Sequence, residues 1–273
     1  MTPNPRHLIL KLLLGAEGAP MSARDAIASC ALFGIRENSA RVALVRLSAA
    51  GLIEAEARGT YRIGPKAAEL AEEVRTWRSV ESRVQRWSGA WLAVHCGALG
   101  RTDRTALRQR ERALELLGFR ELDRDLFVRP DNLVGGVADA RSRLYRLGLD
   151  ADAAVFVVSS FDGKRDERAR SLWNTKALTR SYVQTRQRLE KWLARAQRID
   201  LEVAARESFL LGNEAIRRLV FDPLLPDPLA DVKERRAFIA TVIELDQVGH
   251  DIWRRLFGPL REQEASASSL LHH

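Results

Sequence analysis

A short stretch of this sequence gathers side chains suited to binding nucleic acid. Residues 36–46 place polar and basic side chains, with one valine, at the spacing of a helix surface: Arg36, Asn38, Ser39, Arg41, Val42 and Arg46. Short polar side chains and arginine near the start of a helix hydrogen-bond base edges and phosphates. Arg58 and Arg62 follow at a second place, around the turn Arg58-Gly59. The types and spacing of these eight residues predict a DNA-binding surface.

The neighbouring residues predict the helices that position this surface. Ser22 and Asp25 predict a capping box for a helix over residues 23–31, and residues 33–35 (Phe-Gly-Ile) predict a turn. The next helix is expected over residues 37–50, with three residues at helical spacing facing a core: Ala40, Leu44 and Leu47.

Two short strands are expected after this helix, at residues 52–54 and 60–63, with Gly59 in the turn between them. Helix, turn, second helix and hairpin follow the order of a winged helix-turn-helix, in which the second helix enters the DNA major groove. The alternative is a solvated basic surface, in which Arg62 pairs with Glu54 or Glu56 across the hairpin.

A long helix is expected from Pro65 to about residue 87, because proline is tolerated at the first helical position. Its apolar residues recur at spacings of three and four: Leu70, Val74, Trp77, Val80, Val84 and Trp87. Such a stripe either packs on the chain's own domains or forms a dimer seam. A continuous helix here would be a lever between the DNA-binding head and the rest of the chain.

The middle of the chain predicts one compact unit. Two buried strands are expected at residues 90–96 and 153–159, two helices at residues 102–117 and 132–147, and a hairpin at residues 119–128. The order βαββαβ is the ferredoxin-like split motif. This topology resembles that of small CRISPR-associated nucleases, whose metal ion requires a carboxylate at the end of the first strand. His95-Cys96-Gly97 occupies that position here, and Asp162 is isolated. The sequence favours a structural or dimerising role for this unit.

Helices dominate after residue 164 and are expected at residues 166–197, 200–221 and 230–257. Three prolines within residues 222–228 predict a rigid break. We therefore expect an α+β multidomain protein with five segments. These are a winged helix-turn-helix (1–64), a linker helix (65–88), a central ferredoxin-like domain (89–162), a helical C-terminal domain (163–260) and a disordered tail (261–273).

Four aromatic residues lie at helical spacing in the C-terminal part: Trp173, Tyr182, Trp192 and Trp253. Such residues are either core or the lining of an apolar effector pocket between helices. Lys176, Arg180 and Arg186 lie nearby and either bind phosphate groups of a ligand or form a solvated face. The predicted effector site is Trp173, Lys176, Arg180, Tyr182 and Arg186.

Composition bounds these interpretations. The 273 residues are 46% hydrophobic and carry a net charge of +8, which suits two or three globular domains and a polyanionic partner. Cys30 and Cys96 are isolated and are expected to be reduced core residues of a cytoplasmic protein. The chain shows no signal-peptide pattern and no apolar run that suits a membrane span, and no metal or cofactor motif was found, so neither a cofactor nor enzymatic activity is expected.

The ordered set of blocks resembles the PaaX-like regulators, repressors of phenylacetate catabolism. The resemblance rests on residues 33–35, 41–47 (Arg-Val-Ala-Leu-Val-Arg-Leu), 60–65 (Thr-Tyr-Arg-Ile-Gly-Pro), 172–174 (Leu-Trp-Asn), Tyr182, Trp192 and 222–226 (Asp-Pro-Leu-Leu-Pro). Arg36 stands where this family typically has serine. The resemblance implies a homodimeric repressor that binds double-stranded operator DNA and is released by an aryl-acetyl-CoA or related acyl-CoA. The alternatives are a protein-interaction or oligomerisation module and a metal-dependent nuclease.

Overall fold

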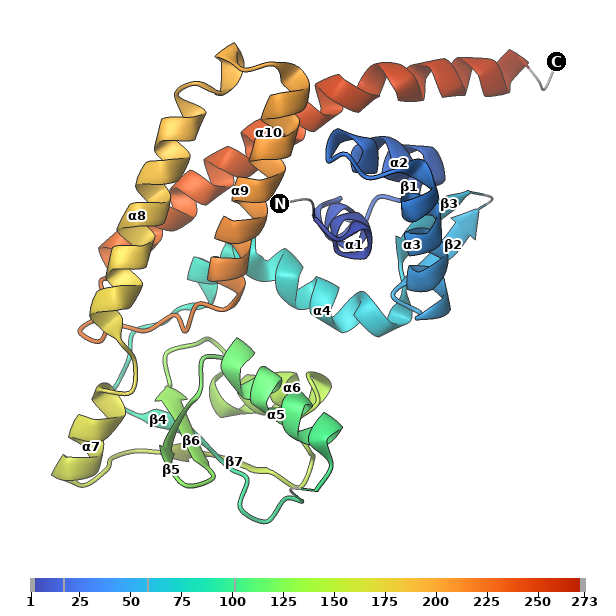
Figure 1. Cartoon of the computed structure of the whole chain (residues 1–273). Helices are drawn as coiled ribbons and strands as arrows, with labels where there is room; N and C mark the ends of the chain where they lie inside the picture. Colours follow the sequence, from blue (N-terminus) through green and yellow to red (C-terminus); the bar gives the residue numbers. More distant parts are fainter. Residues whose placement is uncertain (1–2, 17, 58, 101, 271–273) are drawn as a thin grey trace. The chain divides into compact units, whose positions relative to one another are not determined.

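The protein is described by a computed structural model of residues 3–16, 18–57, 59–100 and 102–270 (Figure 1). The described part is α+β with two antiparallel sheets, as the sequence predicts. The chain divides into two compact units. Unit 1 comprises Met1–Arg75, Arg188–Ile216 and Thr241–His273, and unit 2 comprises Thr76–Gln187 and Arg217–Ala240.

The N-terminal part of unit 1 contains helices and a small sheet in the order α1 (Pro5–Gly15), β1 (Met21–Ser22), α2 (Ala23–Leu32), α3 (Glu37–Ala49), β2 (Ile53–Ala57), β3 (Thr60–Ile63) and α4 (Pro65–Arg75). The predicted helices and hairpin are present. The sequence missed β1, which pairs with β3 through only two residues and adds a third strand, in the order β1-β3-β2. A strand of two residues is too short to show the alternation of apolar and polar side chains that marks a strand in a sequence.

Local caps and a common core hold these elements together. The Ser22 hydroxyl accepts the Asp25 N–H at 2.9 Å, as the capping pattern predicts. The core takes side chains from α1, α2 and α3: Leu8, Ile9, Leu13, Ala26, Cys30, Ala40, Leu44 and Leu47. Burial raises the pKa of the Cys30 thiol to about 11, which keeps it protonated and unreactive at neutral pH.

The C-terminal helices are α8 (Thr175–Leu193), α9 (Leu201–Val220) and α10 (Val232–Leu270), with a short 3-10 helix at Ala196–Arg198. Within unit 1, Phe209 of α9 packs against the N-terminal core and meets Phe33 edge-on, with ring centroids 5.4 Å apart. Arg206 also donates to the Leu32 carbonyl at 3.3 Å. The N-terminal elements and α9 therefore share a packed interface.

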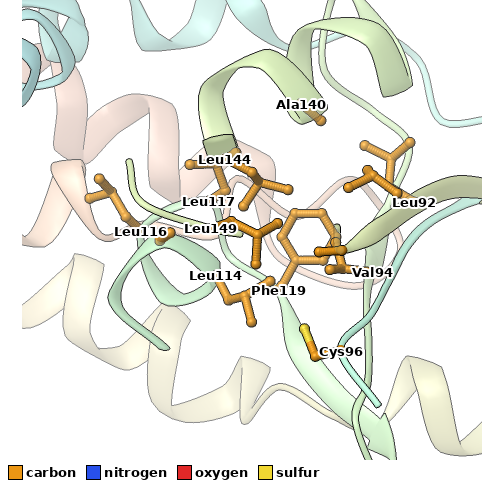
Figure 2. Packing of buried hydrophobic residues seen from close by; sticks show 13 residues of the cluster. Leu92, Val94, Cys96, Leu114, Leu116, Leu117, Phe119, Ala140, Leu144 and Leu149 are labelled. Carbon is orange, nitrogen blue, oxygen red and sulfur yellow. The ribbon is translucent and has the colours of Figure 1, made fainter. Parts of the chain in front are cut away.

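Unit 2 contains β4 (Trp91–His95), α5 (Arg104–Leu116), β5 (Arg120–Asp123), β6 (Leu126–Pro130), α6 (Gly136–Arg146) and β7 (Ala154–Val158). The strands form one antiparallel sheet in the order β5-β6-β4-β7. Figure 2 shows the ring of Phe119 among aliphatic side chains from β4 and from both helices. The predicted βαββαβ order of elements is present.

The predicted continuous helix over residues 65–87 is wrong. It ends as α4 at Arg75 and gives way to a 3-10 segment, Thr76–Arg83, that is kinked at Ser79. Serine hydroxyls compete for backbone carbonyls there: Ser82 donates to the Ser79 carbonyl at 2.7 Å. Trp77 and Val80 are buried, whereas the side chains of Leu70 and Val74 lie outside the described residues. A single rigid lever helix is therefore excluded.

Two further helix predictions need correction. The helix expected at 166–197 is interrupted between α7 (Gly163–Arg170) and α8, because Asn174 accepts the Ala177 N–H at 3.0 Å and starts a new helix. The tail expected to be disordered from residue 261 continues α10 to Leu270, through a stretch rich in the helix formers glutamate and alanine. Among the described helices, none is long and apolar enough to span a membrane.

Candidate nucleic-acid interface

α3 separates a buried face from an exposed face along its whole length. Ala40, Leu44 and Leu47 are at most 3% exposed, which confirms the predicted core face. Ser39 is half-buried. The opposite face is open to solvent, from the residue before the helix to its last turn, and carries Arg36, Asn38, Arg41, Val42, Val45 and Arg46. The predicted residues of this helix are thus brought together on one surface.

The arginines of this surface are weakly held. Arg41 pairs with Glu37, one turn earlier, at 2.7 Å, and both side chains are 61% exposed. Exposed pairs of this kind are screened by water and contribute little to stability. Arg36 and Arg46 are exposed and make no ion pair with any residue that the structure describes. Arg36 precedes the helix and makes no side-chain cap, so its guanidinium is not used for folding.

Two valines lie among these arginines. Val42 is 42% exposed and Val45 is 67% exposed. Apolar side chains on a DNA-facing helix contact the methyl group of thymine in the major groove. The sequence pattern predicts Val42 as a contact residue but not Val45. Its spacing of three from Val42 was a signal that would have placed it on the same face.

The hairpin carries charges of both signs. Glu54 of β2 faces Arg62 of β3, and their side chains approach to 2.8 Å; Glu56 lies 3.9 Å from the same arginine. The cross-strand pairing raised as an alternative from the sequence is therefore present. Arg58 lies outside the described residues. Gly59 has a φ of 78°, a left-handed conformation that glycine adopts without strain.

The five residues of the predicted effector site all belong to unit 2. Trp173 is buried and stacks on Trp91 of β4, with centroids 6.2 Å apart. Tyr182 is buried and donates to the Asp222 carboxylate. Arg186 pairs with Glu234 at 3.2 Å, while Lys176 and Arg180 are exposed. Their role in binding an effector stays a prediction.

Sequence reasoning missed a buried polar network in unit 2 that fastens the proline-rich segment. Arg129 of β6 is 2% exposed and donates to the carbonyls of Leu117 and Pro223, and Asn132 donates to the Leu224 carbonyl at 2.7 Å. Burial lowers the pKa of Arg129 to about 10, so the guanidinium stays charged at neutral pH. These bonds satisfy carbonyls of a segment that has few backbone partners of its own.

Two more buried groups complete this network. Arg235 of α10 is fully buried, donates to the Leu225 carbonyl at 2.6 Å and pairs with Glu81 at 2.8 Å. Burial raises the pKa of Glu81, but the hydrogen bonds from Arg236 and Arg235 outweigh it and leave the pKa below its ordinary value. Burial raises the pKa of Asp222, whose carboxylate accepts a hydrogen bond from the Tyr182 hydroxyl.

The residues considered for a nuclease have structural partners instead. Asp162 caps α7 by accepting the Arg165 N–H at 3.0 Å, and its carboxylate pairs with the Arg165 guanidinium at 2.8 Å. The hydrogen bond from that side chain lowers the pKa of Asp162. Cys96 is buried beside the end of β4, and burial raises its pKa to about 11.

Two family models match separate stretches of the chain. Residues 4–67 match the family described as PaaX-like protein, and residues 173–255 match the PaaX-like protein C-terminal domain. No curated protein matches the chain. The solved structure of an uncharacterized protein from Mycobacterium tuberculosis has a similar fold, with a TM-score of 0.58 and 23% identity over 91% of this chain and 98% of that one. At this identity the likeness concerns the fold alone.

Proposed function

Because the chain belongs to the PaaX-like family, we propose that it is a sequence-specific DNA-binding transcriptional regulator. The observation that carries this proposal is the exposed face of α3. Arginine, asparagine and valine side chains stand there on a helix whose other face is anchored in a core. In this proposal α1–α3 and β1–β3 work as a winged helix-turn-helix, with α3 in the major groove and the hairpin on the backbone.

Each side chain of α3 has a role that follows from its chemistry. Asn38, at the start of the helix, is suited to an adenine edge, and Arg46 to guanine or a phosphate oxygen. Val42 and Val45 pack on thymine methyl groups. Arg36 and Ser39 flank this set and bind the adjacent phosphates.

The Arg41–Glu37 pair is suited to rearrangement on DNA. Because both side chains are largely exposed, exchanging the pair for a phosphate or a guanine costs little. Glu37 is then released to accept a hydrogen bond from a cytosine amino group. Arg62 similarly exchanges Glu54 for the phosphate backbone, as Arg58 does at the tip of the hairpin.

We further propose a homodimer whose two reading helices occupy successive major grooves, about 34 Å apart. Edge strand β7 supports this part of the proposal, since Phe156 and Val157 are 39% and 45% exposed on it. An open strand with apolar side chains is a natural site for pairing with a second copy.

The family resemblance favours a repressor that an acyl-CoA releases from its operator. Release requires that the effector bind the DNA-free arrangement more tightly than the DNA-bound one. With α4 ending at Arg75, the change must be transmitted by packing rather than by one rigid helix.

The test is fluorescence anisotropy of the purified protein on its own upstream promoter DNA, at several salt concentrations, with and without acyl-CoA esters. We expect a dissociation constant of about 10⁻⁸ M or lower, at least ~10³-fold weaker binding to scrambled DNA, and release by one ester. Equal, weak binding to both DNAs, unaffected by esters, would contradict the proposal and favour an interaction module.

A further inference from the structure

Unit 1 contains a pocket of about 570 Å³ between the N-terminal helices and the C-terminal helices. Its walls come from α1, α2, α9 and α10, together with the turn that joins α1 to β1. The lining is mainly apolar, with Leu12, Met21, Phe209, Ile216, Leu245 and Trp253 among its residues. Ligand pockets in proteins typically measure ~300–1,000 Å³ and have apolar walls with few polar groups.

One wall is a fixed series of aromatic rings. Phe209 lies 6.1 Å from Trp253 and Trp253 lies 5.5 Å from Phe257, centroid to centroid. The indole of Trp253 is held in place because its N–H donates to the Ala205 carbonyl at 3.2 Å. Flat, rigid aromatic faces favour a partner that is itself an aromatic ring or an aliphatic chain.

Two glycines within helices keep the pocket open. Gly212 of α9 and Gly249 of α10 both line it. A Cβ added at Gly212 would meet no atom within 4 Å, and one added at Gly249 would make ordinary contact with Ser208 at 3.6 Å. Glycine destabilises a helix interior relative to alanine. No packed neighbour requires glycine at Gly212, and this position opens directly onto the pocket.

Polar and charged side chains also line the pocket. Ser29 is 3% exposed, and the His250 imidazole is oriented by the carbonyls of Asp246 and Gly15, at 2.8 and 3.3 Å. Lys11 and Arg254 bring positive charge, and Asp25 and Asp246 bring negative charge. This arrangement suits a ligand with a large apolar group and a small polar end.

We propose that this pocket binds the aryl or acyl group of the effector, whether presented as a free acid or as a CoA thioester. The proposal rests on the proposed function and locates the effector in unit 1 rather than among Trp173, Tyr182 and their neighbours. Trp253, one of the four aromatic candidates in the sequence, is the one that lines this pocket.

The pocket is placed to act on the reading helix through α2. Asp25 and Ser29 of α2 line the pocket, while Ala26 and Cys30 of the same helix pack in the core that also holds Ala40 of α3. Close-packed cores transmit small shifts because they have few voids to absorb them. A ligand that displaces α2 therefore shifts α3 as well. Operator affinity falls if α3 binds DNA less tightly in its shifted position.

The experiment compares wild type with Gly212→Phe, which fills the pocket, and Leu210→Phe, which adds a ring at an exposed position of the same helix. Calorimetric titration uses phenylacetyl-CoA, octanoyl-CoA, free phenylacetate and CoA itself. We expect wild type to bind at least one probe that carries an apolar group, and not CoA. Gly212→Phe should weaken that binding at least tenfold, and Leu210→Phe by less than twofold.

Operator binding without ligand should stay within twofold in Leu210→Phe, and a thermal melt confirms that both variants fold. If Gly212→Phe does not melt cooperatively, Gly212→Leu takes its place. Unchanged ligand affinity in the filled variant, or no binding of any probe by wild type, overturns the proposal. If the wild-type protein binds the ligand but no operator, and Gly212→Phe loses ligand binding, the result supports the pocket and rejects the proposed function. The contrast between free acid and thioester identifies the form that binds.

Discussion

The arginines of α3 and the buried arginines of unit 2 use the same side chain in opposite ways. Arg41 is largely exposed and pairs with an equally exposed Glu37. Arg235 is fully buried, and its pair with Glu81 is accompanied by a bond to the Leu225 carbonyl. The first guanidinium is available to a new partner, whereas the second is committed to the fold. Burial, rather than residue type, separates a binding arginine from a structural one.

The largest effect should come from removing Glu81, the acid of the buried pair. Glu81→Ala leaves the buried charge of Arg235 without its carboxylate, and we expect the free energy of unfolding to fall by about 3 kcal/mol. Glu37→Ala, the matched change on α3, should stay within about 0.5 kcal/mol. Urea unfolding followed by tryptophan fluorescence measures both. An equal decrease in the free energy of unfolding in the two variants would contradict the difference between the buried pair and the exposed pair.

The stability contributed by the buried Glu81–Arg235 pair also depends on pH. The pKa of Glu81 is lowered in the folded protein, so its contribution to stability is present above the ordinary glutamate pKa. It is lost as the pH falls through the lowered value. The difference in the free energy of unfolding between wild type and Glu81→Ala should therefore disappear at acidic pH.

A smaller effect is expected from Tyr182→Phe. This change removes the hydroxyl that donates to the buried Asp222, and a buried acceptor left without its donor costs about 1–3 kcal/mol. The loss should appear in the unfolding curve, with no change in the affinity for acyl-CoA. If Tyr182 instead belongs to the effector site, as the sequence predicts, ligand affinity should fall while stability changes little. The two measurements on one variant separate these roles.

The parts of the fold predicted from the sequence depend on short-range patterns. The faces of α3 follow from the spacing of Ala40, Leu44 and Leu47, and the start of α2 follows from Ser22. The order of strands and helices in unit 2 follows in the same way. Such signals lie within a few residues of one another and survive in a single sequence.

The parts that were missed depend on distant residues. Arg129 and Pro223 lie far apart in the chain, so nothing local marks that arginine as buried. The pocket of unit 1 combines α1 and α2 with α9 and α10, and its empty space has no sequence pattern beyond two glycines in helices. The apolar stripe after Pro65 misled for the same reason. Trp77 and Val80 are buried by tertiary packing in a 3-10 segment, not on a continuous helix.

If the exposed arginines of α3 bind DNA, replacing them should weaken operator binding. The most direct measurement is the salt dependence of operator binding for wild type and for Arg41→Ala combined with Arg46→Ala. Each lost phosphate contact should reduce the slope of log K against log[salt] by about one, and each lost base contact should cost about 1–3 kcal/mol. We expect a shallower slope and at least ~30-fold weaker binding, with an unchanged melting temperature. A folded double variant with wild-type affinity and slope would contradict it.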